Sequence, residues 1–192
     1  IWVGTFGGGV SIIDPTTSRV SRISHDPTND RALSSPRATA ITQDRNGVIW
    51  IGTDGGGLNA IDERGNVLGR WRHDSRDFTS LSSNTIYALQ VDRAGHLWIG
   101  TDSGGLDRLV GAPGKNGDVR FTNVSTDDGL TSNAIYGIHA SDDGALWLSG
   151  NQGLMRYDPA KGSTRKFHRE HGLQGEEFNF GAHHRLADGR LV

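Results

Sequence analysis

The chain has 192 residues, among them 28 glycines and no cysteine, and its 20 Lys and Arg against 22 Asp and Glu leave a net charge of −2. The lack of cysteine excludes disulfides, thiolate metal sites and cysteine catalysis. The interspersed charges leave no basic surface, which argues against nucleic acid as a partner. No run of about 18 apolar residues occurs, so we expect no membrane span within the chain itself.

A unit of about 48 residues recurs along the sequence. Four similar segments, IWVGT, IWIGT, LWIGT and LWLSG, each contain a tryptophan. These residues are Trp2, Trp50, Trp98 and Trp147, and they are spaced 48, 48 and 49 residues apart. Such a period is typical of solenoids, propellers and other repeat architectures. We therefore treat residues 1–192 as a single domain with approximate repeats at 1–36, 37–84, 85–133, 134–177 and 178–192, of which the first and last are partial. Because the chain has no initiator Met and ends inside an apolar strand pattern, we expect it to be part of a longer protein.

Each unit reads as four short strands separated by turn residues. In the first complete unit the strands are expected at 37–43, 48–53, 57–62 and 67–73, and in the second at 85–91, 96–101, 106–110 and 118–124. These segments are rich in β-branched and aromatic residues, and Gly, Asp and Asn fill the turns between them. No segment has an apolar period of about 3.6 residues. The pattern predicts an all-β chain made of β-propeller blades, each with four antiparallel strands.

The repeated tryptophans and glycines are expected to have structural roles. A blade buries its faces only against neighbouring blades, so Trp2, Trp50, Trp98 and Trp147 are predicted to anchor blade-to-blade packing. Glycine provides positive φ or room for close backbone approach in tight turns. This predicts turn roles for Gly55, Gly56, Gly104 and Gly105.

The segment DRNGVIWIGTDGGGLNAID, followed by RWRHDSRDFTSLSSNTIYALQVDRAGHLWIGT, closely resembles the two-component regulator propeller repeat. That family occurs in periplasmic sensor regions of bacterial hybrid histidine kinases and of some diguanylate cyclases. Residues 172–182, GLQGEEFNFGA, resemble its last repeat, which precedes an immunoglobulin-like domain. The resemblance implies a non-catalytic periplasmic ligand-sensing module without a cofactor, in a parent that spans the membrane and carries a kinase or cyclase domain.

Strand geometry places the candidate ligand-binding residues. If the strands run a to d in chain order, the b-to-c turns and the linkers between blades lie on one face of the propeller. Binding residues concentrate in such loops, so we assign tentative ligand contacts to His25, Asp26, Asp54, His73, Asp74, Arg76 and Asp102. A polar and aromatic lining suits an oligosaccharide or another small molecule. The alternative is that Asp26 and Asp74 only cap turns. Phe6 stands where other units have Asp54 and Asp102, so the blades are not equivalent.

Catalysis is a weaker interpretation. The sequence has no nucleophile elbow and no HExxH motif, and residues 142–147 match the Asp-box of sialidase-type propellers only in part. Adjacent histidines such as His183 and His184 point to opposite faces of a strand, so we assign no metal site and no catalytic residue. Carboxylates from different blades could still converge. A propeller glycoside hydrolase or lyase and a lectin-like scaffold therefore remain alternatives.

Ring closure has two solutions. The segment 178–186 could pair with residues 1–5 and complete a four-bladed ring, or the chain could be an open arc of a larger ring. We expect the open arc, with seven blades in the parent. Exposed strand edges favour pairing between chains, so a homodimer is a further expectation.

Overall fold

The computed structural model describes residues 1–113, 118–186 and 190. These residues form four antiparallel sheets in which the spatial order of the strands equals their order in the chain. The first sheet contains β1 (Trp2–Thr5), β2 (Gly9–Ile13) and β3 (Val20–Ile23). The second contains β4 (Ala38–Gln43), β5 (Ile49–Thr53), β6 (Gly57–Ile61) and β7 (Val67–Trp71).

The other two sheets repeat this plan. The third contains β8 (Ile86–Val91), β9 (Leu97–Thr101), β10 (Leu106–Val110) and β11 (Arg120–Val124). The fourth contains β12 (Ile135–Ala140), β13 (Leu146–Gly150), β14 (Gly153–Asp158) and β15 (Ser163–Phe167). Two short 3₁₀ turns, Thr126–Asp128 and Arg169–His171, follow the third and fourth sheets. The all-β, bladed architecture predicted from the repeat is confirmed.

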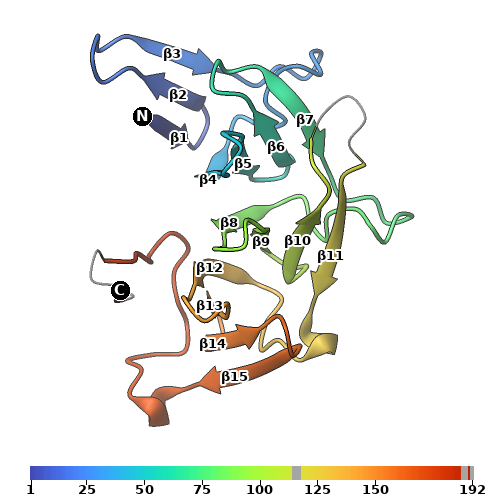
Figure 1. Ribbon diagram of the computed structural model, residues 1–192, viewed down its shortest axis with the longest axis vertical. Coiled ribbons are helices and arrows are strands. Elements are labelled where there is room, and N and C mark those ends of the chain that lie inside the picture. The colour runs from blue at the N-terminus through green and yellow to red at the C-terminus, as the bar shows by residue number, and fades with distance from the viewer. Residues whose placement is uncertain (114–117, 187–189, 191–192) are drawn as a thin grey trace.

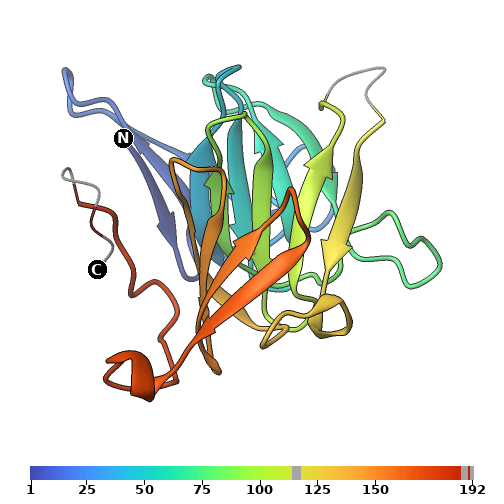
Figure 2. The same cartoon turned by 60° about the horizontal axis from the view of Figure 1, so that its bottom comes forward.

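The sheets are arranged as blades of an open arc (Figure 1). Strands β1, β4, β8 and β12 lie on the concave side, and β3, β7, β11 and β15 form the rim. Consecutive blades contact one another through their inner strands, β1 with β4, β4 with β8, and β8 with β12. Figure 2 shows the strands of successive blades side by side, with the chain after β15 returning to the open side of the arc. We refer to the space enclosed by the inner strands as the axis.

Tight turns define the register inside a blade. Thr53 on β5 pairs with Gly57 on β6, and the intervening residues form the turn. Gly57 has φ of 79°, and a Cβ there would lie 2.1 Å from the carbonyl oxygen of Trp71. Glycine is therefore required both for the backbone conformation and for the approach of β7. The observed strand bounds in the two complete central blades differ from the expected ranges by at most two residues at either end.

The core lies between the blades. Trp50 on β5 is buried in a cluster with Leu81, from the linker between blades, and with Ile86, Ile99 and Phe121 of the following blade. Blades approach closely because glycine stands two residues after the tryptophan, and a Cβ on Gly52 would lie 2.5 Å from Cγ2 of Ile86. Burial of large apolar side chains across such interfaces is the main stabilising contribution available to a blade.

The four tryptophans are not equivalent. Trp98 lies in a cluster with residues of the fourth blade, and Trp2 packs against a cluster that includes residues of the second. Trp147 is only half-buried; its ring lies 5.1 Å from that of Phe167 in its own blade. It also lines a pocket together with residues of its own blade and of the segment after β15, including Leu173 and Phe178. Leu173 and Phe178 stand where Leu81 and Ile86 stand beside Trp50, so the blade-to-blade role expected of Trp147 stays a prediction.

The pairing considered for the C-terminal segment is wrong. Residues 178–186 form no strand, and β1 pairs only with β2 among the described residues. The segment instead packs on the fourth blade, where Arg185 Nη1 donates to the carbonyl of Ala140 at 3.1 Å and His183 lies against His139. The segment contacts β12 and forms no strand that pairs with β1, so the described residues form an arc and not a ring closed by strand pairing.

No helix in the described part of the chain has the length and apolar character that a membrane crossing requires.

Candidate ligand-binding face

The turns between second and third strands and the linkers between blades meet on one face, as strand geometry predicts. The amide of Gly57 donates to the carbonyl of Asn84 at 2.8 Å, which joins a turn of the second blade to the linker that enters the third. The amide of Gly105 donates to the carbonyl of Asn133 at 2.9 Å in the same way, which joins a turn of the third blade to the linker that enters the fourth. We call this side the loop face.

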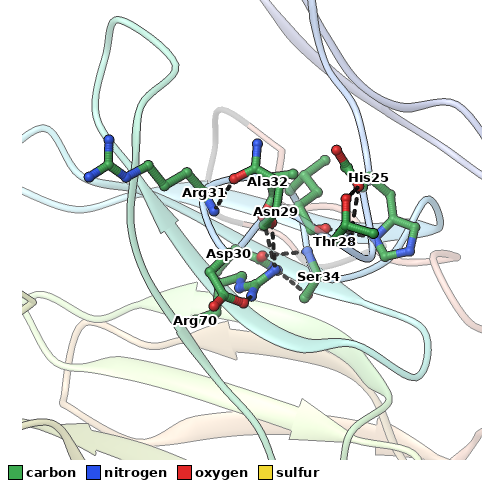
Figure 3. Close-up of polar contacts among 11 residues, drawn as sticks. His25, Thr28, Asn29, Asp30, Arg31, Ala32, Ser34 and Arg70 are labelled. Atoms are coloured by element: carbon green, nitrogen blue, oxygen red, sulfur yellow. Dashed lines mark hydrogen bonds and ion pairs between the residues drawn. The ribbon is translucent and has the colours of Figure 1, made fainter.

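Two histidines close the linkers. Nδ1 of His25 lies 2.7 Å from the carbonyl oxygen of Leu33, and Nδ1 of His73 lies at the same distance from that of Leu81. A carbonyl can only accept, so Nδ1 carries the proton in both rings. Figure 3 shows His25 beside the linker that it closes. The repetition of this contact in two blades indicates a structural role for Nδ1, while Nε2 of each ring is left for other partners.

The side chains of Asp26, Asp74 and Arg76 form hydrogen bonds within the linkers between blades. Asp26 Oδ1 accepts from the amide of Thr28 at 2.9 Å and from its hydroxyl at 2.7 Å. Asp74 Oδ1 accepts from the amide of Arg76 at 3.0 Å, and the Arg76 guanidinium folds back onto the same carboxylate. The hydrogen bonds from Thr28 and Arg76 lower the pKa of these two carboxyl groups. This geometry matches the turn-capping alternative for both aspartates.

Asp54 and Asp102 join each turn to the start of an inner strand. Asp54 accepts from the hydroxyl of Thr85 at 3.2 Å and forms an ion pair with Arg37 at 3.2 Å. Asp102 accepts from the hydroxyl of Ser83 at 2.6 Å. The seven candidate residues are thus distributed over several positions on the loop face; Asp54 and His25 line two different pockets in the described part of the chain.

A second pair of polar residues was missed by sequence reasoning. Asn59 and Asp107 are fully buried at the same position of the third strand. Asn59 Oδ1 accepts from the amide of Ser34 at 3.0 Å, and Asp107 Oδ2 accepts from the amide and the hydroxyl of Ser82, both at 2.9 Å. Burial raises the pKa of Asp107. The recurrence of GGLN and GGLD opposite LSS was the available signal, because a repeated polar residue inside an apolar strand requires a buried partner.

The loop face opens at the axis into a pocket of about 400 Å³. Its lining combines aromatic rings with carboxylates and other polar groups, and it comprises Phe6, Thr39, Asp54, Tyr87, Tyr136, Glu177, Phe178, Asn179 and Phe180. The ring of Tyr87 lies 5.5 Å from that of Tyr136 and 4.9 Å from that of Phe180. We call this the axial pocket; Asp54 is the one sequence-predicted ligand residue that lines it.

The axial pocket draws on every blade. Thr39, Tyr87 and Tyr136 occupy equivalent positions near the start of the inner strands β4, β8 and β12. Phe6 is 71% exposed, and the guanidinium carbon of Arg37 lies 5.4 Å from its ring centre. Burial raises the pKa of Tyr87, so its hydroxyl stays protonated and can donate as well as accept. The repeated Ile-Tyr dipeptide at residues 86–87 and 135–136 was the sequence signal for these rings.

Two histidines, one on β12 and one in the C-terminal segment, lie close together. Nδ1 of His183 lies 3.1 Å from Nε2 of His139. Burial, and secondarily the charge of His183, lowers the pKa of His139 to about 4, and burial also lowers that of His183. Among the described residues, no three His, Cys, Asp or Glu side chains are grouped so that they could hold a metal ion.

Comparison with known proteins matches two segments of the chain, residues 32–55 and 80–103, to the family described as two component regulator propeller. The resemblance noted in the sequence is confirmed by this match. No curated protein matches the chain.

The chain also matches solved structures of extracellular domains. The extracellular domain of a proposed hybrid two component system, BT3049 from B. thetaiotaomicron, matches with 25% identity and a TM-score of 0.76 over 99% of this chain and 24% of that one. The extracellular domain of the proposed one component system BT4673 of the same organism matches with 23% identity and a TM-score of 0.75 over 99% and 26%. This chain therefore spans about a quarter of the length of those domains.

A catalytically inactive virginiamycin B lyase from Staphylococcus aureus is a more distant match. It has 14% identity and a TM-score of 0.62, and the match covers 95% of this chain and 54% of that one. This similarity extends to the fold alone.

Proposed function

We propose that this chain, which carries two-component regulator propeller repeats, is part of an extracytoplasmic ligand-sensing propeller of a bacterial signal-transduction protein. The support comes from its similarity to extracellular domains of proteins described as one and two component systems. In the parent, the propeller binds a small molecule outside the cytoplasm, and the change in blade packing passes to a kinase or cyclase domain across the membrane. The neighbouring coding sequence tests this part: a frame without a membrane span or an output domain contradicts it.

The axial pocket is the ligand site in this proposal, and a carbohydrate is the ligand class. The main support for this assignment is the pair Tyr87 and Tyr136 on the loop face. Their ring centres lie 5.5 Å apart, and Asp54 lines the same pocket. Flat aromatic rings cover the apolar face of a sugar ring, and carboxylates and hydroxyls accept or donate to its hydroxyl groups. Because the tyrosines come from two blades, a ligand between them would respond to the spacing of β8 and β12.

Saccharide titrations followed by amide chemical shifts test the site. We use neutral mono- and oligosaccharides and expect shifts at Thr39, Tyr87 and Tyr136. Replacement of Tyr136 by Ala should weaken binding about tenfold, since one stacking contact and one hydrogen bond are lost. Phe78→Ala is the matched control, because this aromatic side chain is 97% exposed and lies outside the pocket. Absence of binding by the whole panel, or equal effects of the two variants, contradicts the carbohydrate assignment.

A further inference from the structure

A separate pocket of about 500 Å³ lies between the first linker and the end of β7. Its lining is polar and comprises His25, Pro27, Asp30, Ser34, Arg70 and Arg72. The residues that line this pocket do not line the axial pocket. We call it the linker pocket.

Two arginines supply its charge. The Arg70 side chain is only 23% exposed; its Nη1 donates to the carbonyls of Asn29 at 3.4 Å and Ala32 at 3.3 Å, and its Nη2 pairs with the carboxylate of Asp30. Figure 3 shows Arg70 beneath the linker that contributes these groups. Arg72 Nη2 donates to the carbonyl of Gly55 at 2.6 Å. Asp30 is the only carboxylate among the lining residues, so two guanidinium groups outnumber it.

Further donors are available. A guanidinium carries five N–H groups, and the bond to Gly55 uses only one end of Arg72. His25 uses Nδ1 for the carbonyl of Leu33, which leaves Nε2 for another partner. The Asp30 side chain is fully exposed, so its ion pair with Arg70 is open to solvent and to exchange.

The next blade shows that the fold does not need these arginines. Register places Arg70 opposite Asn59 and Asn123 opposite Asp107, so Asn123 and Ser125 stand where the second blade has Arg70 and Arg72. The linker of that blade is closed by His73 in the same way as the first linker is closed by His25. Asn123 Nδ2 donates to the carbonyl of Gly104 at 2.8 Å and to Asp107 Oδ1 at 2.9 Å. The same framework thus forms with neutral side chains at both positions.

We propose that the linker pocket binds the oxyanion group of an acidic small molecule, a carboxylate or a sulfate, through Arg72, Arg70 and Nε2 of His25. Arginine forms paired, charge-assisted hydrogen bonds with planar or tetrahedral oxyanions. The Asp30 carboxylate occupies one of these donors and acts as an internal competitor. The site is independent of the axial pocket, and its test does not depend on the signalling role.

Amide chemical-shift titrations at low ionic strength test the proposal, with glucuronate and inorganic sulfate as probes and glucose as the neutral match. We expect shifts at Ser34 and Arg72 with at least one anion and none there with glucose. Response to glucuronate alone assigns a carboxylate site, and response to sulfate alone or to both probes assigns a site for sulfate or for oxyanions in general. Absence of a response to both anions overturns the proposal.

Variants identify the residues. Arg72→Gln should weaken anion binding about tenfold, because a charge-assisted hydrogen bond is lost. Asp30→Asn should strengthen binding, since the competing carboxylate is removed while the linker backbone is retained. Arg76→Gln is the matched control; this arginine is 88% exposed on the next linker and lies outside the pocket. Equal effects of Arg72→Gln and Arg76→Gln, or weaker binding in Asp30→Asn, would refute the assignment. The amide spectrum of each variant reports whether it is folded.

Discussion

Replacement of Trp50 by Ala tests the packing between blades most directly. The side chain is 1% exposed, and its ring lies 5.8 Å from that of Trp71 inside a cluster shared with the third blade. A buried tryptophan removes about 150 Å² more apolar surface from water than alanine does. At about 25 cal/mol per Å², the change costs about 4 kcal/mol, within the range of about 3 to 5 kcal/mol for large-to-Ala changes in cores.

The polar end of Trp50 adds little to this value. Nε1 donates to Asp44 Oδ2 at 2.9 Å. Asp44 keeps two other donors when the indole is removed, because its Oδ1 accepts from the amides of Asn46 at 2.8 Å and Val48 at 3.0 Å. Asp44 is only half-buried, so its Oδ2 can accept from water, and the loss of the indole N–H contributes about 1 kcal/mol at most.

Urea unfolding followed by circular dichroism measures the effect without relying on tryptophan emission. Trp147→Ala is the matched comparison, since Trp147 occupies the equivalent position but is half-buried, and Ser141 stands where the other blades have Asp44 and Asp92. We expect the free energy of unfolding to fall by about 4 kcal/mol for Trp50→Ala and by clearly less for Trp147→Ala. Equal losses, or a loss below about 1 kcal/mol for Trp50→Ala, would refute the packing argument.

Two further predictions concern pH. Burial raises the pKa of Asp107, so the folded protein is most stable with this carboxyl protonated and loses stability as the pH rises from about 4. Asp107→Asn, which reproduces Asn59, should remove this loss of stability. Identical pH profiles of unfolding for the variant and the unsubstituted protein would contradict the prediction. The pKa of His139 is lowered to about 4, so the contact with His183 should lose stability as the pH falls from about 6.5. Hydrogen exchange in residues 173–186, corrected for intrinsic rates, should then increase between pH 7 and 5, and His139→Gln should abolish the increase.

Local chemistry explains how much of the fold could be predicted. Strand positions follow from β-branched and aromatic segments between turn residues, and both signals lie within a few residues of each other. The shared face of turns and linkers follows from antiparallel pairing alone. The course of residues 178–186 could not be predicted this way, because it depends on which surfaces are available beside the last blade.

The candidate sites were predicted only in part for the same reason. His25 and Asp54 were selected because they lie in polar loops, and each lines a pocket, but their partners come from distant parts of the chain. Arg70 reads in the sequence as an ordinary exposed strand residue, and Tyr87 as a packing residue.

The sequence by itself therefore determined the repeat, the blade and the face that carries the loops, because period, alternation and turn chemistry are local properties. Only the tertiary structure decided which side chains share a pocket. Asp54, Tyr87 and Phe180 come from three different units, and they meet at the axis because buried interfaces between blades determine the angle at which each inner strand faces the next.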